Sequence, residues 1–226
     1  FTLFLFYEAL TISTYPLVTH KQSEAAVAAG RTYLLLLLGT SLLLFLPAII
    51  GTWYLAGTLD FTPGGILTDK ASGPVIGILL GFFIFGIGKA GVMPLHFWLP
   101  AAMVAPTPVS ALLHAVAVVK AGVFTILKVA VLIFGVDLLA STGQSGWLTI
   151  VAGTTVIAAS LVALRQDNLK RRLAYSTISQ LSYIVLGVAI LTPISFVGAA
   201  MYIAAHAFSK ITLFFAAGSI YTAAHK

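Results

Sequence analysis

The chain has 226 residues, of which 60% are hydrophobic and 8% are charged, and its formal net charge is +6. A soluble globular domain carries about 25% charged residues, so this chain lacks the polar surface that water requires and is predicted to be an integral membrane protein. It has no cysteine, which excludes disulfides, iron–sulfur ligation and thiolate zinc sites within it. Four of its basic residues fall in one short loop and four more inside apolar segments, a distribution that does not indicate nucleic-acid binding.

Seven segments are apolar and about as long as a spanning helix, which needs roughly 20 residues. They cover residues 1–19, 32–57, 74–99, 110–135, 147–164, 173–192 and 195–218. The polar stretch 20–31 is expected to form an amphipathic helix at the membrane interface. The chain is therefore predicted to be an all-α polytopic membrane protein with a single transmembrane domain, residues 1–226. No signal peptide is visible, and we expect further helices before and after it.

Prolines and glycines predict where these helices break. Pro47 predicts a kink in the second span, and Pro94 follows Lys89 closely enough to interrupt the third. Because glycines also surround Lys89, the helix is expected to be broken there (Gly81, Gly86, Gly88 and Gly91). Loops or turns are expected at 58–73, 100–108, 137–146 and 165–172.

Lysine and arginine are unequally distributed between the predicted loops. If the first span runs inward, the outer loops hold only Lys70, and the inner side holds Lys21, Arg31, Arg165, Lys170, Arg171, Arg172 and Lys226. Cytoplasmic loops carry the excess of positive charge, so this bias indicates the orientation. The expected location is a bacterial-type cytoplasmic membrane or an equivalent energy-transducing membrane, which the chain crosses several times.

Several ionisable residues lie inside the predicted spans, where a charge costs about 2.5 to 3.5 kcal/mol on insertion scales. Glu8 falls near the middle of the first span, and we expect it to pair with Lys89; a neutral, hydrogen-bonded carboxylic acid is the alternative. Lys89 is expected to face the interior, because the apolar residues on both sides of it place the headgroups far away.

The fourth and seventh spans carry the other candidates. On a regular helix His114, Lys120 and Lys128 fall within an arc of about 120°, so we expect a stripe that faces a neighbour or a hydrated channel. Lys128 lies toward the outer end and is a secondary candidate. His206 and Lys210 are four residues apart and therefore share a face. For His114, a role in helix contacts alone is an equally good interpretation.

A run of hydroxyls and one amide opens the sixth span, YSTISQLSY (175–183), which makes Ser179 and Gln180 further secondary candidates. Hydrogen bonding between helices explains this run at least as well. A metal site is not expected, because Glu8 is the only acid predicted to be buried, and no cofactor is predicted.

Three long motifs resemble one family. The run KAGVMPLHFWLPAAMVAPTPVSALLHAVAVVKAGV (89–123) is similar to the signature of antiporter-like proton-translocating subunits. These occur in respiratory complex I as its L/M/N-type subunits, in related membrane hydrogenases and in Mrp-type cation/proton antiporters. DNLKRRLAYSTISQLSY (167–183) and AAHAFSKITLFFAAGSI (204–220) resemble the family too, and FYEALTISTYPL (6–17) does so more loosely.

The resemblance implies a larger inverted-repeat fold of about fourteen helices, of which this chain would be helices five to eleven. It also implies a proton relay formed by Glu8, Lys89, His114, Lys120, His206 and Lys210. Where the family often has an acid after WLP, this chain has Ala101 and Ala102, so it lacks the side chain that performs the function of that acid.

The function we expect is translocation of protons, with Na⁺ as the alternative ion, across an energy-transducing membrane. The chain would act beside other membrane subunits, as a translocase subunit of a complex I-like or cation/proton antiporter assembly, with no redox chemistry of its own. The alternatives are a stand-alone secondary transporter and a structural subunit whose buried charges are inert. Quinone reduction in this chain is a weaker third, because no redox ligand set is present.

Overall fold

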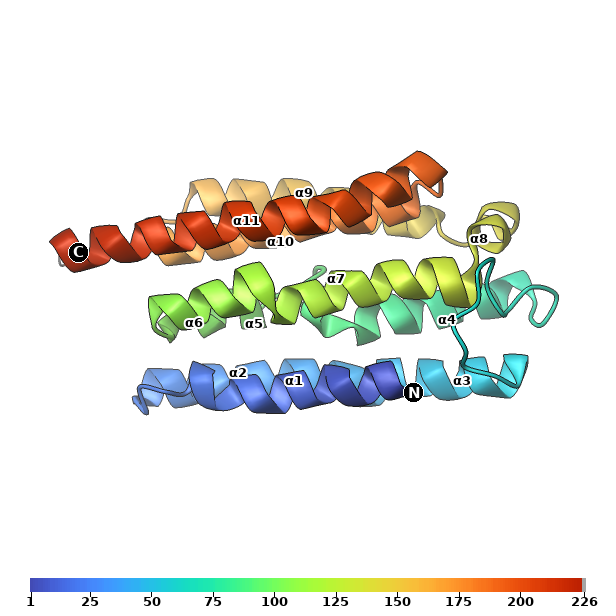
Figure 1. The fold of residues 1–226 in the computed structure, drawn as a ribbon, viewed down its shortest axis with the longest axis horizontal. Helices are drawn as coiled ribbons and strands as arrows, with labels where there is room; N and C mark the ends of the chain where they lie inside the picture. The colour runs from blue at the N-terminus through green and yellow to red at the C-terminus, as the bar shows by residue number, and fades with distance from the viewer. Residues whose placement is uncertain (225–226) are drawn as a thin grey trace.

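The computed structural model describes residues 1–224, and all regular structure among them is helical. The helices run nearly parallel to one another and form three layers (Figure 1). One outer layer holds α1, α2 and α3, the middle layer holds α4 to α7, and the other outer layer holds α9, α10 and α11. The predicted all-α membrane class is consistent with this architecture.

The first layer is built from two long segments. The helix α1 (Thr2–Val18) turns at residues 19–23 into α2 (Glu24–Thr40), which continues through a π-helical turn (Ser41–Phe45) into α3 (Leu46–Ala56). The stretch 20–31 is therefore no separate helix but a turn followed by the first two turns of α2, and its place at the membrane interface stays a prediction. Ser23 caps α2 by accepting a hydrogen bond from the Ala26 amide, so the membrane-length helix begins before its apolar run does.

The second span shows an irregularity beside its proline. Pro47 lies at the start of α3, directly after the π-helical turn. Proline has no amide hydrogen and cannot complete the regular i→i−4 pattern, and a π-helical turn is one way to absorb that loss. The predicted kink takes the form of this wide turn.

The middle layer contains the predicted break. The helix α4 (Gly73–Gly86) stops at Ile87, a short 3₁₀ turn carries Lys89 (Gly88–Ala90), and the next α-helix is only four residues long (α5, Trp98–Ala101). A 3₁₀ turn follows it (Ala102–Val104). A broken helix around Lys89 is thus confirmed, and the second half of that span is mostly turns.

The rest of the middle layer is one 28-residue helical segment, Thr107–Phe134. It consists of α6 (Thr107–Ala111), a π-helical turn (Leu112–Val116), α7 (Val118–Val129) and a second π-helical turn (Ala130–Phe134). The predicted loop 137–146 is wrong for most of its length, because α8 (Val136–Thr142) is helical there.

The last layer holds α9 (Gly146–Leu164), α10 (Leu169–Ala189) and α11 (Pro193–Ala224). The loop predicted at 165–172 is shorter than expected, since Asn168 caps α10 by accepting from the Arg171 amide. The basic residues of this loop therefore lie partly in the first turn of α10.

Within residues 1–224, four helical segments are long and apolar enough to cross a membrane, namely Glu24–Ala56, Thr107–Phe134, Gly146–Leu164 and Pro193–Ala224. The apolar helices α1 and α4 are shorter. The count of seven spans therefore stays a prediction.

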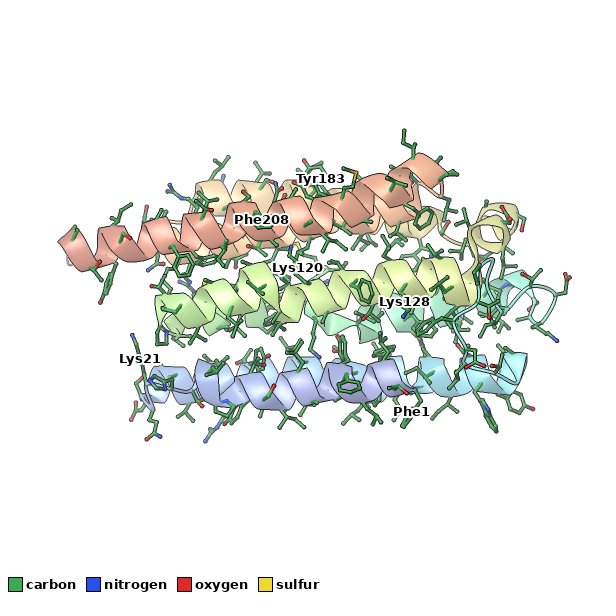
Figure 2. The ribbon with its side chains drawn as sticks, in the orientation of Figure 1. Phe1, Lys21, Lys120, Lys128, Tyr183 and Phe208 are labelled. Atoms are coloured by element: carbon green, nitrogen blue, oxygen red, sulfur yellow. The ribbon has the colours of Figure 1, made fainter. Side chains whose placement is uncertain are left out.

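The bundle carries its large apolar side chains on the outside. Leu35, Leu43 and Phe208 are each 74–75% exposed, and side chains of this kind project from both outer layers (Figure 2). In water such a surface would be an interaction or aggregation site, whereas lipid is a suitable solvent for it. Several lysines and histidines are instead buried between the helices.

The middle layer is held together by a close approach of two backbones. Gly122 of α7 faces the backbone of Lys89 and Ala90, at a point where a β-carbon would overlap with both. The absence of a side chain at Gly122 therefore lets α7 pack directly on the turn that carries Lys89.

We predict that Gly122→Ala lowers the free energy of unfolding by about 1–3 kcal/mol, the usual cost of forcing extra volume into a packed site. The measurement is the thermal unfolding midpoint in detergent. Gly153→Ala in α9 is the matched control, because a β-carbon added at Gly153 would have no neighbouring atom within 4 Å. Equal midpoints for the two variants would contradict the close approach.

Candidate functional site

The ionisable residues predicted to lie in the interior are buried there. Lys89 is 0% exposed, Lys120 is 8%, Lys210 is 3%, and the two histidines of the predicted relay, His114 and His206, are 0% and 4%. Lys89 does not snorkel to a headgroup. Lys128 is only half-buried, and its amine lies 4.1 Å from the ring centroid of Phe61, in the loop between α3 and α4.

Lys89 is enclosed by Tyr7 of α1. Its amine donates to the Tyr7 carbonyl at 2.5 Å and lies 3.1 Å from the centroid of the Tyr7 ring. Its backbone amide donates to the Tyr7 hydroxyl at 3.2 Å. A cation over an aromatic face is stabilised by the ring quadrupole, so Tyr7 supplies both an acceptor and a favourable surface for the amine.

The predicted pair of Glu8 and Lys89 takes a different form from the one expected. The two residues lie on neighbouring elements and interact electrostatically, but the amine of Lys89 bonds to the carbonyl of the residue before Glu8. Both carboxylate oxygens of Glu8 are buried without a hydrogen-bond partner among the described residues. The acid therefore acts on Lys89 through space.

The broken helix is fixed by a second aromatic residue. The indole N–H of Trp98 donates to the Gly88 carbonyl at 3.1 Å, and the Gly91 amide donates to the same oxygen. Trp98 is fully buried and packs edge-on against Tyr33 of α2. A carbonyl freed by the break thus regains partners from within the protein, as backbone at membrane depth requires.

Lys120 of α7 and His206 of α11 form a direct hydrogen bond between the amine and the imidazole Nδ1. Four residues further along α11, Lys210 donates to the Ser176 hydroxyl of α10 at 2.7 Å. The predicted shared face of His206 and Lys210 is therefore the face that packs into the bundle. Lys210 also interacts electrostatically with Lys120, His206 and His114.

His114 lies between aromatic rings. Its ring centroid is 5.5 Å from that of Phe214 and 6.4 Å from that of Trp98, and neither ring nitrogen has a hydrogen-bond partner within residues 1–224. It sits in the π-helical turn Leu112–Val116, so the regular helical wheel used to predict a stripe of three does not apply. His114 and Lys120 both contact side chains of α11, whereas Lys128 faces the loop between α3 and α4.

The secondary candidates of α10 make contacts between helices. Ser179 shares a hydrogen bond of 2.9 Å with Ser160 of α9, and Gln180 accepts one from the Tyr202 hydroxyl of α11. These bonds match the alternative interpretation of the hydroxyl run.

Sequence reasoning did not single out two side chains near the site, Tyr7 and His96. His96 is 7% exposed, its Nδ1 has no partner in the described part of the chain, and its ring lies 6.2 Å from that of Tyr175. The available signal for His96 was its place in the same motif as Lys89, residues 89–123. For Tyr7 the only signal was its position beside Glu8.

No cluster of three or more metal-ligating His, Asp or Glu side chains occurs within the described residues. The ionisable groups that the site brings together are amines, imidazoles and one carboxyl group. Each of these groups binds or releases a proton without any change in the backbone.

A family model described as "NADH:quinone oxidoreductase/Mrp antiporter, TM" matches residues 1–226. The chain belongs to this family. It is 34% identical over 230 residues to the chloroplastic NAD(P)H-quinone oxidoreductase subunit 5 of the fern Adiantum capillus-veneris, covering 96% of this chain and 30% of the fern protein. The subunit 5 of Oryza sativa is 34% identical over 179 residues, which are 76% of this chain and 23% of that protein.

A solved structure of the Mrp complex from Dietzia sp. DQ12-45-1b contains a chain of the same fold, with a TM-score of 0.83 and 29% sequence identity. The match covers 97% of this chain and 24% of that one. The chain therefore spans less than a third of the length of these relatives, and it corresponds to a membrane-embedded part of the family.

We predict that Trp98→Phe lowers the free energy of unfolding by about 0.5–1.5 kcal/mol for the lost hydrogen bond, with a further loss from the smaller ring. The thermal midpoint in detergent measures this. Trp53→Phe is the control, because Trp53 is 58% exposed. A drop of the same size in both variants would argue against a specific role for the Trp98–Gly88 bond.

Proposed function

We propose that this chain carries protons, with Na⁺ as the alternative ion, through a relay of buried side chains within a multi-subunit assembly of an energy-transducing membrane. The relay consists of Glu8, Lys89, His114, Lys120, His206 and Lys210, in an order that follows the packing of α1, α7 and α11. The single observation that carries the proposal is the hydrogen bond between Lys120 and His206.

That bond joins two bases, and its chemistry favours proton sharing. An ammonium group at Lys120 donates to a neutral Nδ1, and a protonated His206 donates to a neutral amine. The two residues cannot both donate along the bond, so a proton that moves from one to the other leaves the bond intact. Both residues are buried. Among the described residues, neither is hydrogen-bonded to a carboxylate that would fix its charge.

A charged side chain from each outer layer acts on the buried bases. On one side Glu8 acts on Lys89, and on the other Lys210 acts on His114, Lys120 and His206. The turn that carries Lys89 packs on α7 at Gly122, two residues from Lys120. A change of charge at Glu8 or Lys89 therefore acts at short range on the helix that holds Lys120. This is the means by which the relay passes its signal.

The comparisons support a subunit rather than an isolated transporter. The plant relatives are named as a subunit of an NAD(P)H-quinone oxidoreductase, and the structural relative is part of an Mrp complex. A stand-alone transporter for an organic solute would also need a recognition pocket at the midplane, and the one buried amide expected for it, Gln180, is bonded to Tyr202. We therefore propose neighbouring membrane subunits as partners.

We predict that Lys120→Gln reduces proton transport at least tenfold. Lys120 and His206 are the only two basic side chains hydrogen-bonded to each other among the described residues of the site, and the substitution removes the titratable amine of this pair. The measurement is acidification of proteoliposomes that contain the purified assembly. Lys128→Gln is the matched control and keeps near-normal transport, since Lys128 faces the loop between α3 and α4. Normal transport with an intact assembly in Lys120→Gln would refute the proposed relay, and loss of assembly without loss of specific activity would favour the structural alternative.

A double-mutant cycle separates a shared proton from two independent roles. We expect Lys120→Gln, His206→Gln and the double variant to lose transport to the same extent, because residues that act as a unit are non-additive. The rate of proton transport per assembled complex is the readout. Multiplicative losses in the double variant would show that the two residues act separately.

A further inference from the structure

A cavity of about 1110 Å³ opens at the end of the bundle where the turn after α1, the segment between α5 and α6, the start of α10 and the end of α11 meet. Figure 1 shows these segments at the end of the molecule where α11 finishes. None of the proposed relay residues lines this cavity. Its charged lining consists of Lys21, Lys170 and Arg171, and no aspartate or glutamate lies among the described lining residues.

Lys170 lines this cavity, and a hydrogen bond anchors its side chain there. Its amine donates to the Ala105 carbonyl at 2.5 Å, and a lysine ammonium has three donors, so two remain for a ligand. Burial, together with the charge of Lys21, lowers the pKa of Lys170 to about 8. Two cations thus repel each other across the cavity, and an anion between them would relieve that repulsion.

Arg171 and Lys21 have no side-chain hydrogen bond within residues 1–224, whereas the neighbouring Arg172 is bonded to the Gln166 carbonyl at 2.8 and 3.0 Å. Arg172 is not a lining residue. Of the four basic residues in the segment 165–172, Lys170 and Arg171 therefore line the cavity, whereas Arg165 and Arg172 do not.

The walls of the cavity are mostly apolar. Small residues of α2 form one wall and the last turns of α11 the other, with Met103 and Val104 between them (Ala25, Ala28 and Ala29; Phe215 and Gly218). Phe215 is 52% exposed on the lipid-facing surface. A basic mouth and apolar walls that continue onto this surface are complementary to an anionic amphiphile, and a small hydrated anion uses only the first of these features.

We propose that this cavity binds an anionic phospholipid, with its phosphate held by Lys21, Lys170 and Arg171 and its acyl chains lying along α2 and α11. The charge bias of the loops places this end on the cytoplasmic side, where anionic lipids give the leaflet its negative surface potential. The lipid would connect α2 to α11 in the region of the cavity. This inference does not depend on proton transport by the relay.

Native mass spectrometry of the intact assembly, purified in detergent with added phosphatidylglycerol or phosphatidylcholine, tests the proposal. We expect one phosphatidylglycerol to remain bound, and Lys21→Gln/Lys170→Gln to reduce its retention at least tenfold. Arg31→Gln/Arg165→Gln is the matched control, because it removes the same charge from residues that do not line the cavity. Arg171→Gln, at an exposed position, is a second variant that is expected to weaken retention and that does not endanger folding.

Several outcomes would overturn the proposal. They are equal retention of phosphatidylcholine, equal loss in the control, displacement of the lipid by inorganic phosphate at millimolar concentration, and the absence of any bound lipid because another part of the polypeptide fills the cavity. Proton transport measured on the same samples keeps this test separate from the test of the relay. Loss of lipid with normal transport supports the site without affecting the proposed function.

Discussion

Three buried lysine amines share the interior of this bundle with one carboxyl group, and the rest of the structure depends on how that imbalance is met. Lys89, Lys120 and Lys210 are at most 8% exposed, whereas all acids other than Glu8 are exposed. Charged forms of all these groups would leave an excess of uncompensated positive charge, which is costly in an apolar medium. The amines are held instead by neutral acceptors, namely a backbone carbonyl, an imidazole and a hydroxyl.

The middle layer places these acceptors. The helix α4 ends at Gly86 in a glycine-rich stretch, so Lys89 leaves the helical pattern and reaches the Tyr7 carbonyl of α1. Because Gly122 has no side chain, α7 packs on that turn, and its opposite side presents Lys120 to α11. One helix therefore contacts both groups of buried charges. The proposed relay needs this arrangement, since each group alone is a local hydrogen bond with no route onward.

The sequence predicted the structural features that depend on residues close together in the chain. The break at Lys89 follows from its glycines and proline, and the common face of His206 and Lys210 follows from their spacing. The stretch 20–31 was predicted as a separate helix but joins α2, because an apolar count does not recognise the Ser23 cap. The stripe of His114, Lys120 and Lys128 assumed a regular helix, and the π-helical turn Leu112–Val116 removed that regularity between His114 and Lys120. The acceptors Tyr7 and Ser176 lie 82 and 34 residues from their lysines, a pairing that only the tertiary fold reveals.

We propose that Lys120 and His206 share a proton. Solid-state NMR of the protein in bilayers, with ¹⁵N-labelled lysine and histidine, tests it directly by following the Lys120 amine and the His206 ring through a pH titration. A shared proton predicts that both signals change together over one pH interval, and that the change at Lys120 is altered in His206→Gln. Two separate titrations, or a Lys120 amine that does not respond to the loss of His206, would contradict the account.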